Sequence, residues 1–296
     1  QNIISNDLHE KIISTSDNEF MPIIISINDN FDIKDLKKEF INNNTPIKKR
    51  SSIICDQMQK IAKKTQQPII NIIKEHEEKY ENLKVSWIIN AIFLDANKRL
   101  IKLISNHPNI KSINLKKTKS DIIDYIDTEE YLSIKTEDGT EPGIEAINVR
   151  PLWEMGYTGK GLLVFNYDTG VWPEHPAFSN NFFGNHYPME QCWDGYFADI
   201  PNGHVSDHGT HTLGTIAGLM EESNDTIGIA FKAYWIANDY VTSTVATLPP
   251  IEDMITSFEW ALNPDGDLTT DYDVPDVINN SWRWYNEIDT FQCSGY

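Results

Sequence analysis

Hydrophobic positions in the first part of the chain follow the patterns of alternating strands and helices. Apolar runs of strand length, bounded by polar residues, occupy residues 21–27, 84–97 and 110–115. Between them, apolar residues recur near the helical spacing in residues 47–80 and 98–108. Pro68 is expected to divide the longer helical stretch in two, because proline interrupts the helical hydrogen-bond ladder. This order of elements predicts a small α/β sandwich that ends near residue 116.

The pattern changes after this predicted sandwich. From Lys117 to about Ile147 apolar residues thin out and acidic residues accumulate around a turn-rich stretch, EDGTEPG, which together predict a linker. Leu162 to Phe165 then form a short apolar run bounded by glycines, as expected for a strand buried on both faces of a parallel sheet. The predicted organisation is a first domain, a linker and a second domain, at residues 1–120, 121–147 and 148–296.

Charge is distributed unevenly along the 296 residues. The net charge is −19, yet residues 1–120 hold 20 basic against 14 acidic residues, and the remainder holds 5 against 30. Opposite signs suggest two domains that attract each other, although such charges also serve each domain's own solubility. The lysines are scattered and the chain is acidic overall, which argues against nucleic-acid binding. No apolar stretch reaches the roughly 18 residues that a membrane-spanning helix needs.

Two residues carry the candidate chemistry. Asp168 follows the apolar run of the predicted parallel strand, at the edge of such a sheet where ligands and catalytic groups collect. Taken alone, Asp168 could simply cap the turn that follows it. His208 precedes a helical stretch of small residues, and Gly209 beside it should leave the imidazole unshielded. A buried aspartate that orients an imidazole is the arrangement that activates a hydroxyl nucleophile.

The other histidines and the cysteines give no comparable indication of a catalytic site. His175 and His211 are expected to be packed, hydrogen-bonded histidines. A metal site on His204, His208 and His211 is disfavoured, because no glutamate lies between them as in the HExxH pattern. We therefore predict no metal ligands. The cysteines, which show no CxxC spacing, are Cys55, Cys192 and Cys293. The last two could pair if the protein is secreted.

Three separated motifs resemble those of the subtilisin family of serine proteases. The stretches DTGVWPEHPAF (168–178) and HGTHTLGTIAG (208–218) resemble its aspartate and histidine signatures, in the family's order. PDVINNSW (275–282) resembles its strand beside the substrate cleft. LWEMGYTGKGLLV, IGIAFKAYWIA and FEWALNPDG resemble the bacillopeptidase F-like branch, and residues 20–116 resemble the family's inhibitory propeptide.

The resemblance implies a fold and a domain organisation. The implied fold class is α/β, the first part of a subtilisin-like doubly wound parallel sheet at 148–296. A small α+β, ferredoxin-like propeptide at 1–120 would precede it, with the maturation site in the acidic linker at 121–147. A basic propeptide that docks on an acidic catalytic domain, templates its folding and blocks its cleft would account for the division of charge.

The resemblance also implies roles for particular residues. Asp168 would be the orienting carboxylate and His208 the general base, while Ser281 and Trp282 would lie on the strand that pairs with a peptide substrate. The implied function is a secreted serine endopeptidase made as a zymogen. Its partners would be protein or peptide substrates and its own propeptide, with no cofactor, nucleic acid or membrane.

The chain also departs from the family's pattern. The family's GTSMA-like stretch, which carries the nucleophilic serine, does not occur before Tyr296, and neither does the asparagine of the oxyanion hole. A parallel sheet that ended with the predicted strand at 277–282 would also keep an unpaired edge. We therefore expect an incomplete sequence whose serine lies beyond this chain. Arg283 and Phe231 replace a usual glycine and proline, and Ala177 stands where some members have a calcium-binding aspartate, so structural calcium is not supported there. The alternative function is an inactive remnant that acts as a binding or propeptide-type inhibitor protein.

Overall fold

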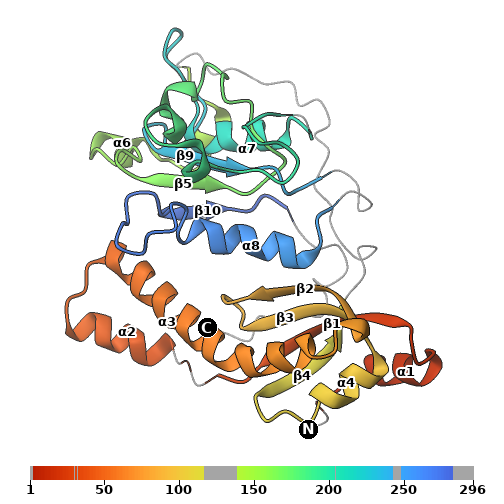
Figure 1. Cartoon of the computed structure of the whole chain (residues 1–296). Helices are drawn as coiled ribbons and strands as arrows, with labels where there is room; N and C mark the ends of the chain where they lie inside the picture. Colours follow the sequence, from red (N-terminus) through yellow and green to blue (C-terminus); the bar gives the residue numbers. More distant parts are fainter. Residues whose placement is uncertain are drawn as a thin grey trace. The chain divides into compact units, whose positions relative to one another are not determined.

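The computed structural model describes most of the chain, and it falls into two compact units (Figure 1). The described residues are 3–29, 31, 33–116, 139–203, 205–242 and 248–282. The first unit comprises 1–118, 251–263 and 267–271, and the second comprises 119–250, 264–266 and 272–296. Most of the predicted linker, residues 117–138, lies outside the described residues, so the predicted maturation site is not described. In the described part of the chain, no helix is long and apolar enough to cross a bilayer.

The first unit is an antiparallel sheet covered by helices. Its elements are α1 (Asn6–Ser14), β1 (Phe20–Ile27), α2 (Ile33–Asn42), α3 (Ile47–Lys74), the 3₁₀ helix η1 (Glu77–Lys79), β2 (Tyr80–Ser86), β3 (Ala91–Asn97), α4 (Lys98–Ile104), β4 (Ile110–Leu115) and α8 (Ile251–Ala261). The strand order is β2-β3-β1-β4, with antiparallel neighbours throughout. Burial along β1 alternates residue by residue, which is the signature of a strand that turns one face to a core.

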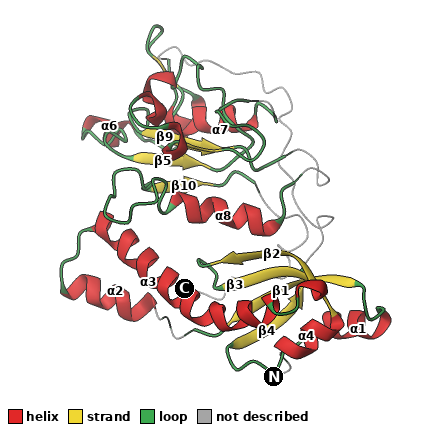
Figure 2. Ribbon diagram, viewed as in Figure 1, coloured by secondary structure: helices red, strands yellow, loops and turns green. Residues whose placement is uncertain are grey.

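Helices α3 and α4 supply the other half of this core (Figure 2). Ile69 and Ile73 of α3 and Leu100 of α4 are fully buried, in one cluster with Ile23 and Ile25 of β1. The predicted division of the 47–80 stretch at Pro68 is wrong, because α3 continues through that residue as one helix of 28 residues. Burial of the turn that follows Pro68 compensates for the hydrogen bond that proline cannot make.

The 84–97 stretch, predicted as one strand, is a hairpin. It contributes the end of β2 and all of β3, joined by a turn over residues 87–90 in which Asn90 has a φ of +46°. Gln66 of α3 holds this turn by donating to the Ser86 carbonyl oxygen at 2.8 Å and to Asn90 Oδ1 at 3.0 Å. The apolar pattern did not reveal the turn because its apolar residues continue those of both strands.

The second unit is built on a parallel sheet. Its helices are α5 (Pro142–Ala146), α6 (Arg150–Glu154), α7 (His208–Ala217) and the 3₁₀ helices η3 (Ser179–Asn181), η4 (Phe183–Asn185) and η5 (Met189–Gln191). Its strands are β5 (Leu163–Asn166), β6 (Trp193–Asp194), β7 (Leu219–Met220), β8 (Asp225–Thr226), β9 (Tyr234–Asn238) and β10 (Val277–Asn279). The main sheet has the order β10-β5-β9-β6 with parallel neighbours, and β7 and β8 form a separate pair. The predicted α/β fold with a parallel sheet is confirmed.

Strand β5 lies inside this sheet, between β10 and β9. All of its residues are buried, as the apolar run predicted. Phe165 of β5 and Trp235 of β9 are fully inaccessible. Since β5 is fixed on both edges and both faces, the residues that follow it leave the sheet from a rigid support.

Candidate active site

Asp168 follows β5 and is completely buried. Its Oδ1 lies 2.6 Å from Nδ1 of His208 and accepts the backbone N–H of Thr169 at 2.8 Å. Its own backbone N–H donates to Oδ1 of Asn238, at the end of β9. The bond from Thr169 is the turn-capping role considered from the sequence, and it coexists with the bond to the imidazole. The backbone of Asp168 is therefore held by the sheet and its carboxylate by the facing helix.

His208 is the first residue of α7 and lies directly against this carboxylate. Its backbone N–H donates to Oγ of Ser206 at 3.1 Å. The imidazole was expected to be unshielded, but its side chain is only 13% exposed because it packs against the fully buried Asp168. The hydrogen bond to Asp168 raises the pKa of His208 above its usual value, and partial burial opposes that rise. The protonated form is thus stabilised relative to that of a free imidazole.

A second set of hydrogen bonds supports Asp168 on the side of its Oδ2, away from His208. Thr212 lies one turn after His208 on α7, and its Oγ1 is 3.0 Å from Oδ2 of Asp168. Asn166, fully buried at the end of β5, donates from Nδ2 to Oγ1 of Thr212 at 3.3 Å. Neither Thr212 nor Asn166 was predicted from the sequence. A polar residue inside a buried apolar strand, and a hydroxyl on the same helical face as His208, were the available signals.

Ser281 and Trp282 follow β10, on the edge of the sheet next to β5. Trp282 donates from Nε1 to the Tyr167 carbonyl oxygen at 3.0 Å, and the two rings lie 5.3 Å apart. Oγ of Ser281 lies 3.0 Å from Nδ2 of Asn279, which donates to it. The structure therefore brings Trp282 beside the residue that precedes Asp168. Arg283 lies outside the described residues.

The remaining histidines differ in their environments. His175 stacks on Phe178 with 4.8 Å between ring centroids, and its Nδ1 lies 3.2 Å from the donating backbone N–H of Ala177. His211, expected to be packed as well, is exposed, because its position on α7 turns away from the sheet. His204 lies outside the described residues, and within the residues described no group of three acidic, histidine or cysteine side chains is placed to hold a metal ion.

The cysteine prediction remains open. Cys192 is buried with Sγ 3.9 Å from the Tyr187 carbonyl oxygen, and burial raises the pKa of this thiol to about 12. Cys293 lies outside the described residues. A pairing of Cys192 with Cys293 therefore stays a prediction.

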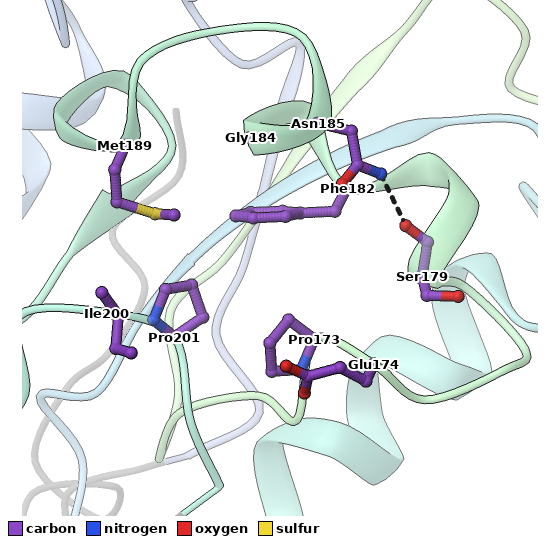
Figure 3. Close-up of a pocket in the computed structure, with 9 residues that line it drawn as sticks. All are labelled: Pro173, Glu174, Ser179, Phe182, Gly184, Asn185, Met189, Ile200 and Pro201. Carbon is purple, nitrogen blue, oxygen red and sulfur yellow. Dashed lines mark hydrogen bonds between the residues drawn. The ribbon is translucent and has the colours of Figure 1, made fainter.

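Two hollows lie in the segment between Asp168 and His208. One, of about 520 Å³, is lined by apolar side chains that include Phe182, Met189 and Pro201 (Figure 3). The other, of about 660 Å³, includes Asp207 and Thr210, which flank His208. They share the residues Pro173, Glu174 and Pro201. The second hollow is thus the one next to the Asp168–His208 pair.

The buried carboxylate at the end of a parallel strand and the imidazole beside it have the geometry of two members of the arrangement that activates a hydroxyl nucleophile. Residues 159–290 match the model of the Subtilase family (Peptidase_S8). The relationship supports a serine peptidase function.

Among curated proteins, the chain is similar to bacillopeptidase F of Bacillus subtilis (strain 168), with 26% identity over 278 residues, which cover 82% of this chain and 18% of that protein. It is 35% identical over 115 residues to the minor extracellular protease Vpr of the same strain, covering 34% and 13%. It is 30% identical over 146 residues to furin-like protease 2 of Drosophila melanogaster, covering 43% and 8%. The chain spans less than a fifth of the length of these relatives.

Two solved structures are also similar to this chain. The epidermin leader peptide processing serine protease of Staphylococcus aureus has 13% identity and a TM-score of 0.47, with 88% of this chain and 50% of that chain covered. Fervidolysin of Fervidobacterium pennivorans, a keratinolytic enzyme related to subtilisin, has 16% identity and a TM-score of 0.47, with 92% and 38% covered.

Proposed function

We propose that this chain is part of a secreted serine endopeptidase that is made as a zymogen and uses an Asp/His/Ser triad. The observation that carries the proposal is the 2.6 Å separation of Asp168 Oδ1 and His208 Nδ1 at the end of a buried parallel strand. In the order of the family, the serine follows the histidine motif, and we place it after Tyr296.

The proposed mechanism is acyl transfer. Because Nδ1 of His208 donates to Asp168, Nε2 of the neutral imidazole carries the lone pair and takes the proton of the serine hydroxyl. The serine oxygen bonds to the carbonyl carbon of the peptide, and His208 then gives its proton to the departing amine nitrogen. Water, deprotonated by the same imidazole, cleaves the acyl-enzyme and regenerates the serine. Asp168 stabilises the imidazolium in both half-reactions.

Peptide substrates would bind by adding a strand beside β10, which is an edge of the described sheet. Ser281 and Trp282 lie just beyond the end of this strand, after Asn280. The indole N–H of Trp282 is already used by Tyr167, so its ring would serve as a wall of the cleft. Recognition would then depend mainly on the substrate backbone, which suits a broad class of proteins or peptides.

The proposed propeptide role of residues 1–120 is supported by contacts inside the first unit. Helix α8, which the sequence places between β9 and β10, packs on strand β2 of that unit. One carboxylate oxygen of Glu259 on α8 accepts from Ser86 Oγ at 2.6 Å, from the Trp87 backbone N–H at 2.8 Å and from that of Ile88 at 3.2 Å. A single acidic side chain of α8 thus satisfies three donors of the β2–β3 turn.

Ion pairs add to these contacts. Lys116 Nζ lies 2.8 Å from Oε1 of Glu252, and both side chains are largely buried. Lys84 pairs with Asp253. These bonds join basic residues of the 1–120 segment to acidic residues of α8, in agreement with the opposite charges of the two parts of the sequence. They favour the propeptide role over charges that serve solubility alone.

The test uses the full-length protein that contains this sequence. We expect a fluorophosphonate probe to label it on a serine after maturation, and a denatured protein substrate to be cleaved. His208→Ala should abolish both, while Thr215→Val, a neighbouring change on α7, should abolish neither. If the wild-type protein takes no label and cleaves nothing, the peptidase proposal is wrong. Inhibition of another subtilase by the unlabelled protein would then support the inhibitor alternative.

A further inference from the structure

A chain of polar side chains behind Asp168 has no part in the mechanism described above; Asn166 in it is fully buried, and Thr212 and Asn279 are half-buried. It begins at Asn279 of β10, passes through Asn166 of β5 and Thr212 of α7, and ends on the carboxylate of Asp168. Polar groups at such positions are costly unless hydrogen bonds satisfy them. Apolar residues would fill the same space between strand and helix at no such cost, so the polar chain calls for a functional reason.

We propose that Thr212, held in place by Asn166, is a positioning residue that fixes the carboxylate plane of Asp168 and so aims its Oδ1 at His208. The inference deepens the proposed function and rests on it for its catalytic meaning. It concerns geometry within the second unit, where every residue involved is described.

The single hydroxyl hydrogen of Thr212 has competing acceptors. Oγ1 lies 3.0 Å from Oδ2 of Asp168, 3.1 Å from the Gly209 carbonyl oxygen and 3.4 Å from Oδ1 of Asn166. An ionised carboxylate oxygen is the strongest acceptor of the three and is also the nearest. The hydrogen therefore points to Asp168, and the lone pairs of Oγ1 remain available to accept from Asn166 Nδ2 at 3.3 Å.

The amide of Asn166 is held by its other bonds. Its Nδ2 donates to the Gly209 carbonyl oxygen at 2.9 Å, and its Oδ1 accepts from Nδ2 of Asn279 at 2.9 Å. Donors and acceptors on both sides leave the amide one orientation. Because Asn166 already occupies the Gly209 carbonyl oxygen, Thr212 is further directed toward Asp168.

The two carboxylate oxygens of Asp168 accept hydrogen bonds from different donors. Oδ1 of Asp168 receives His208 and the Thr169 backbone N–H, and Oδ2 receives Thr212, its donor among the described residues. The terminal torsion of an aspartate is soft, so a donor on each oxygen is needed to hold the plane. Without the hydroxyl, Oδ2 would be a buried, unsatisfied, charged acceptor, and the carboxylate would turn to find another donor.

The first measurement is a kinetic comparison in the full-length protein. Thr212→Val keeps the shape of the side chain and removes the donor. We expect kcat to fall about tenfold while KM stays within about twofold, because substrate contacts are unchanged. Thr212→Ser restores the hydroxyl and should recover most of kcat. Thr215→Val is the matched control, since the Thr215 hydroxyl bonds only the His211 carbonyl oxygen among the described partners and its side chain is exposed.

The second measurement follows His208 itself and does not need activity. Protein labelled with ¹⁵N-histidine is titrated by NMR. Without the Thr212 donor the carboxylate turns and its Oδ1 loses its alignment with Nδ1 of His208. The hydrogen bond that raises the pKa of His208 is then weaker, so this pKa should be lower in Thr212→Val than in the wild type. Asp168 is the charged group that the described structure places against this imidazole. Thr212→Ser and Thr215→Val should titrate like the wild type.

The outcomes separate the two proposals. Wild-type values of both kcat and the His208 pKa in Thr212→Val would overturn the inference, as would an equal loss of kcat in Thr212→Ser. A wild-type protein without peptidase activity would overturn the proposed function, whereas a lowered His208 pKa in Thr212→Val would still establish that Thr212 aims Asp168 at the imidazole. If Thr212→Val fails to fold, Thr212→Ala provides the same comparison.

Discussion

Gly209 lies so close to the Gly170 carbonyl oxygen that a Cβ on Gly209 would stand 2.1 Å from that oxygen, far inside van der Waals contact. The same Cβ would be 3.1 Å from Cβ of Asp168. The backbone N–H of Gly209 donates to Oγ1 of Thr169 at 3.0 Å. The absence of a side chain is what lets the first turn of α7 approach the end of β5, and this approach sets the contact between His208 and Asp168.

Gly209→Ala is therefore expected to separate the helix from the strand. The backbone oxygen of Gly170 cannot move aside as a flexible side chain could, so we expect a destabilisation of about 1–3 kcal/mol and a loss of peptidase activity. Urea unfolding and activity assays measure the two effects. Gly143→Ala is the control, because a Cβ there meets nothing within 4 Å. An unchanged midpoint for Gly209→Ala would show that the two backbones are not in fixed contact.

Asp168→Asn tests the orienting carboxylate without altering its shape. The amide can present its NH₂ group to Nδ1 of His208, which favours the wrong tautomer of the imidazole. In serine proteases this kind of change lowers kcat by about 10⁴-fold. We expect a loss of that order in the mature full-length protein, with KM little changed. A loss of less than about tenfold would mean that Asp168 does not orient the base.

The raised pKa of His208 predicts how stability depends on pH. A raised pKa means that folding favours protonated His208, so this stabilisation is full below the ordinary pKa of 6.5 and is lost as the pH rises through the higher folded value. The free energy of unfolding of the wild type should thus exceed that of His208→Gln most clearly near pH 5.5, and the difference should shrink by pH 9. Urea titrations across this range give the measurement. His211→Gln controls for loss of an exposed histidine on α7.

The same raised pKa has a consequence for catalysis. The proposed base accepts a proton only when it is neutral, so kcat/KM of the mature enzyme should fall on the acid side with a midpoint above 6.5. A stopped assay with a peptide substrate from pH 5 to 10 determines this midpoint. A midpoint well below 6.5 would contradict the close pairing of Asp168 with His208.

Glu259→Ala tests the attachment of α8 inside the first unit. The substitution leaves the Ser86 hydroxyl and the backbone N–H groups of Trp87 and Ile88 without their shared acceptor. We expect the unit to lose about 1–3 kcal/mol of stability, with faster hydrogen exchange in the β2–β3 turn and in α8. Glu39→Ala, at an exposed position of α2, is the control. Equal exchange in wild type and Glu259→Ala would show that these bonds do not hold the helix.

Several individual elements could be predicted from local pattern. The apolar run at Leu162–Phe165 indicated the buried strand β5, and the small residues after His208 indicated the helix α7. Two local predictions were wrong, the break at Pro68 and the single strand over residues 84–97. In both places the deciding contacts come from elsewhere in the fold. Buried Ile69 and Ile73 carry α3 past the proline, and Gln66 holds the turn that divides the strand.

The sequence by itself determined the two candidate catalytic residues, Asp168 and His208, because each stands in a recognisable local motif. Only the tertiary structure decided what surrounds them. It buried most of the imidazole, left His211 exposed and brought Thr212 and Asn166 behind the carboxylate. Asn166 and Asn279 are 113 positions apart in the chain. Periodicity reports which face of an element is buried, but it carries no information about which distant side chain will meet that face, and hydrogen bonds depend on that meeting.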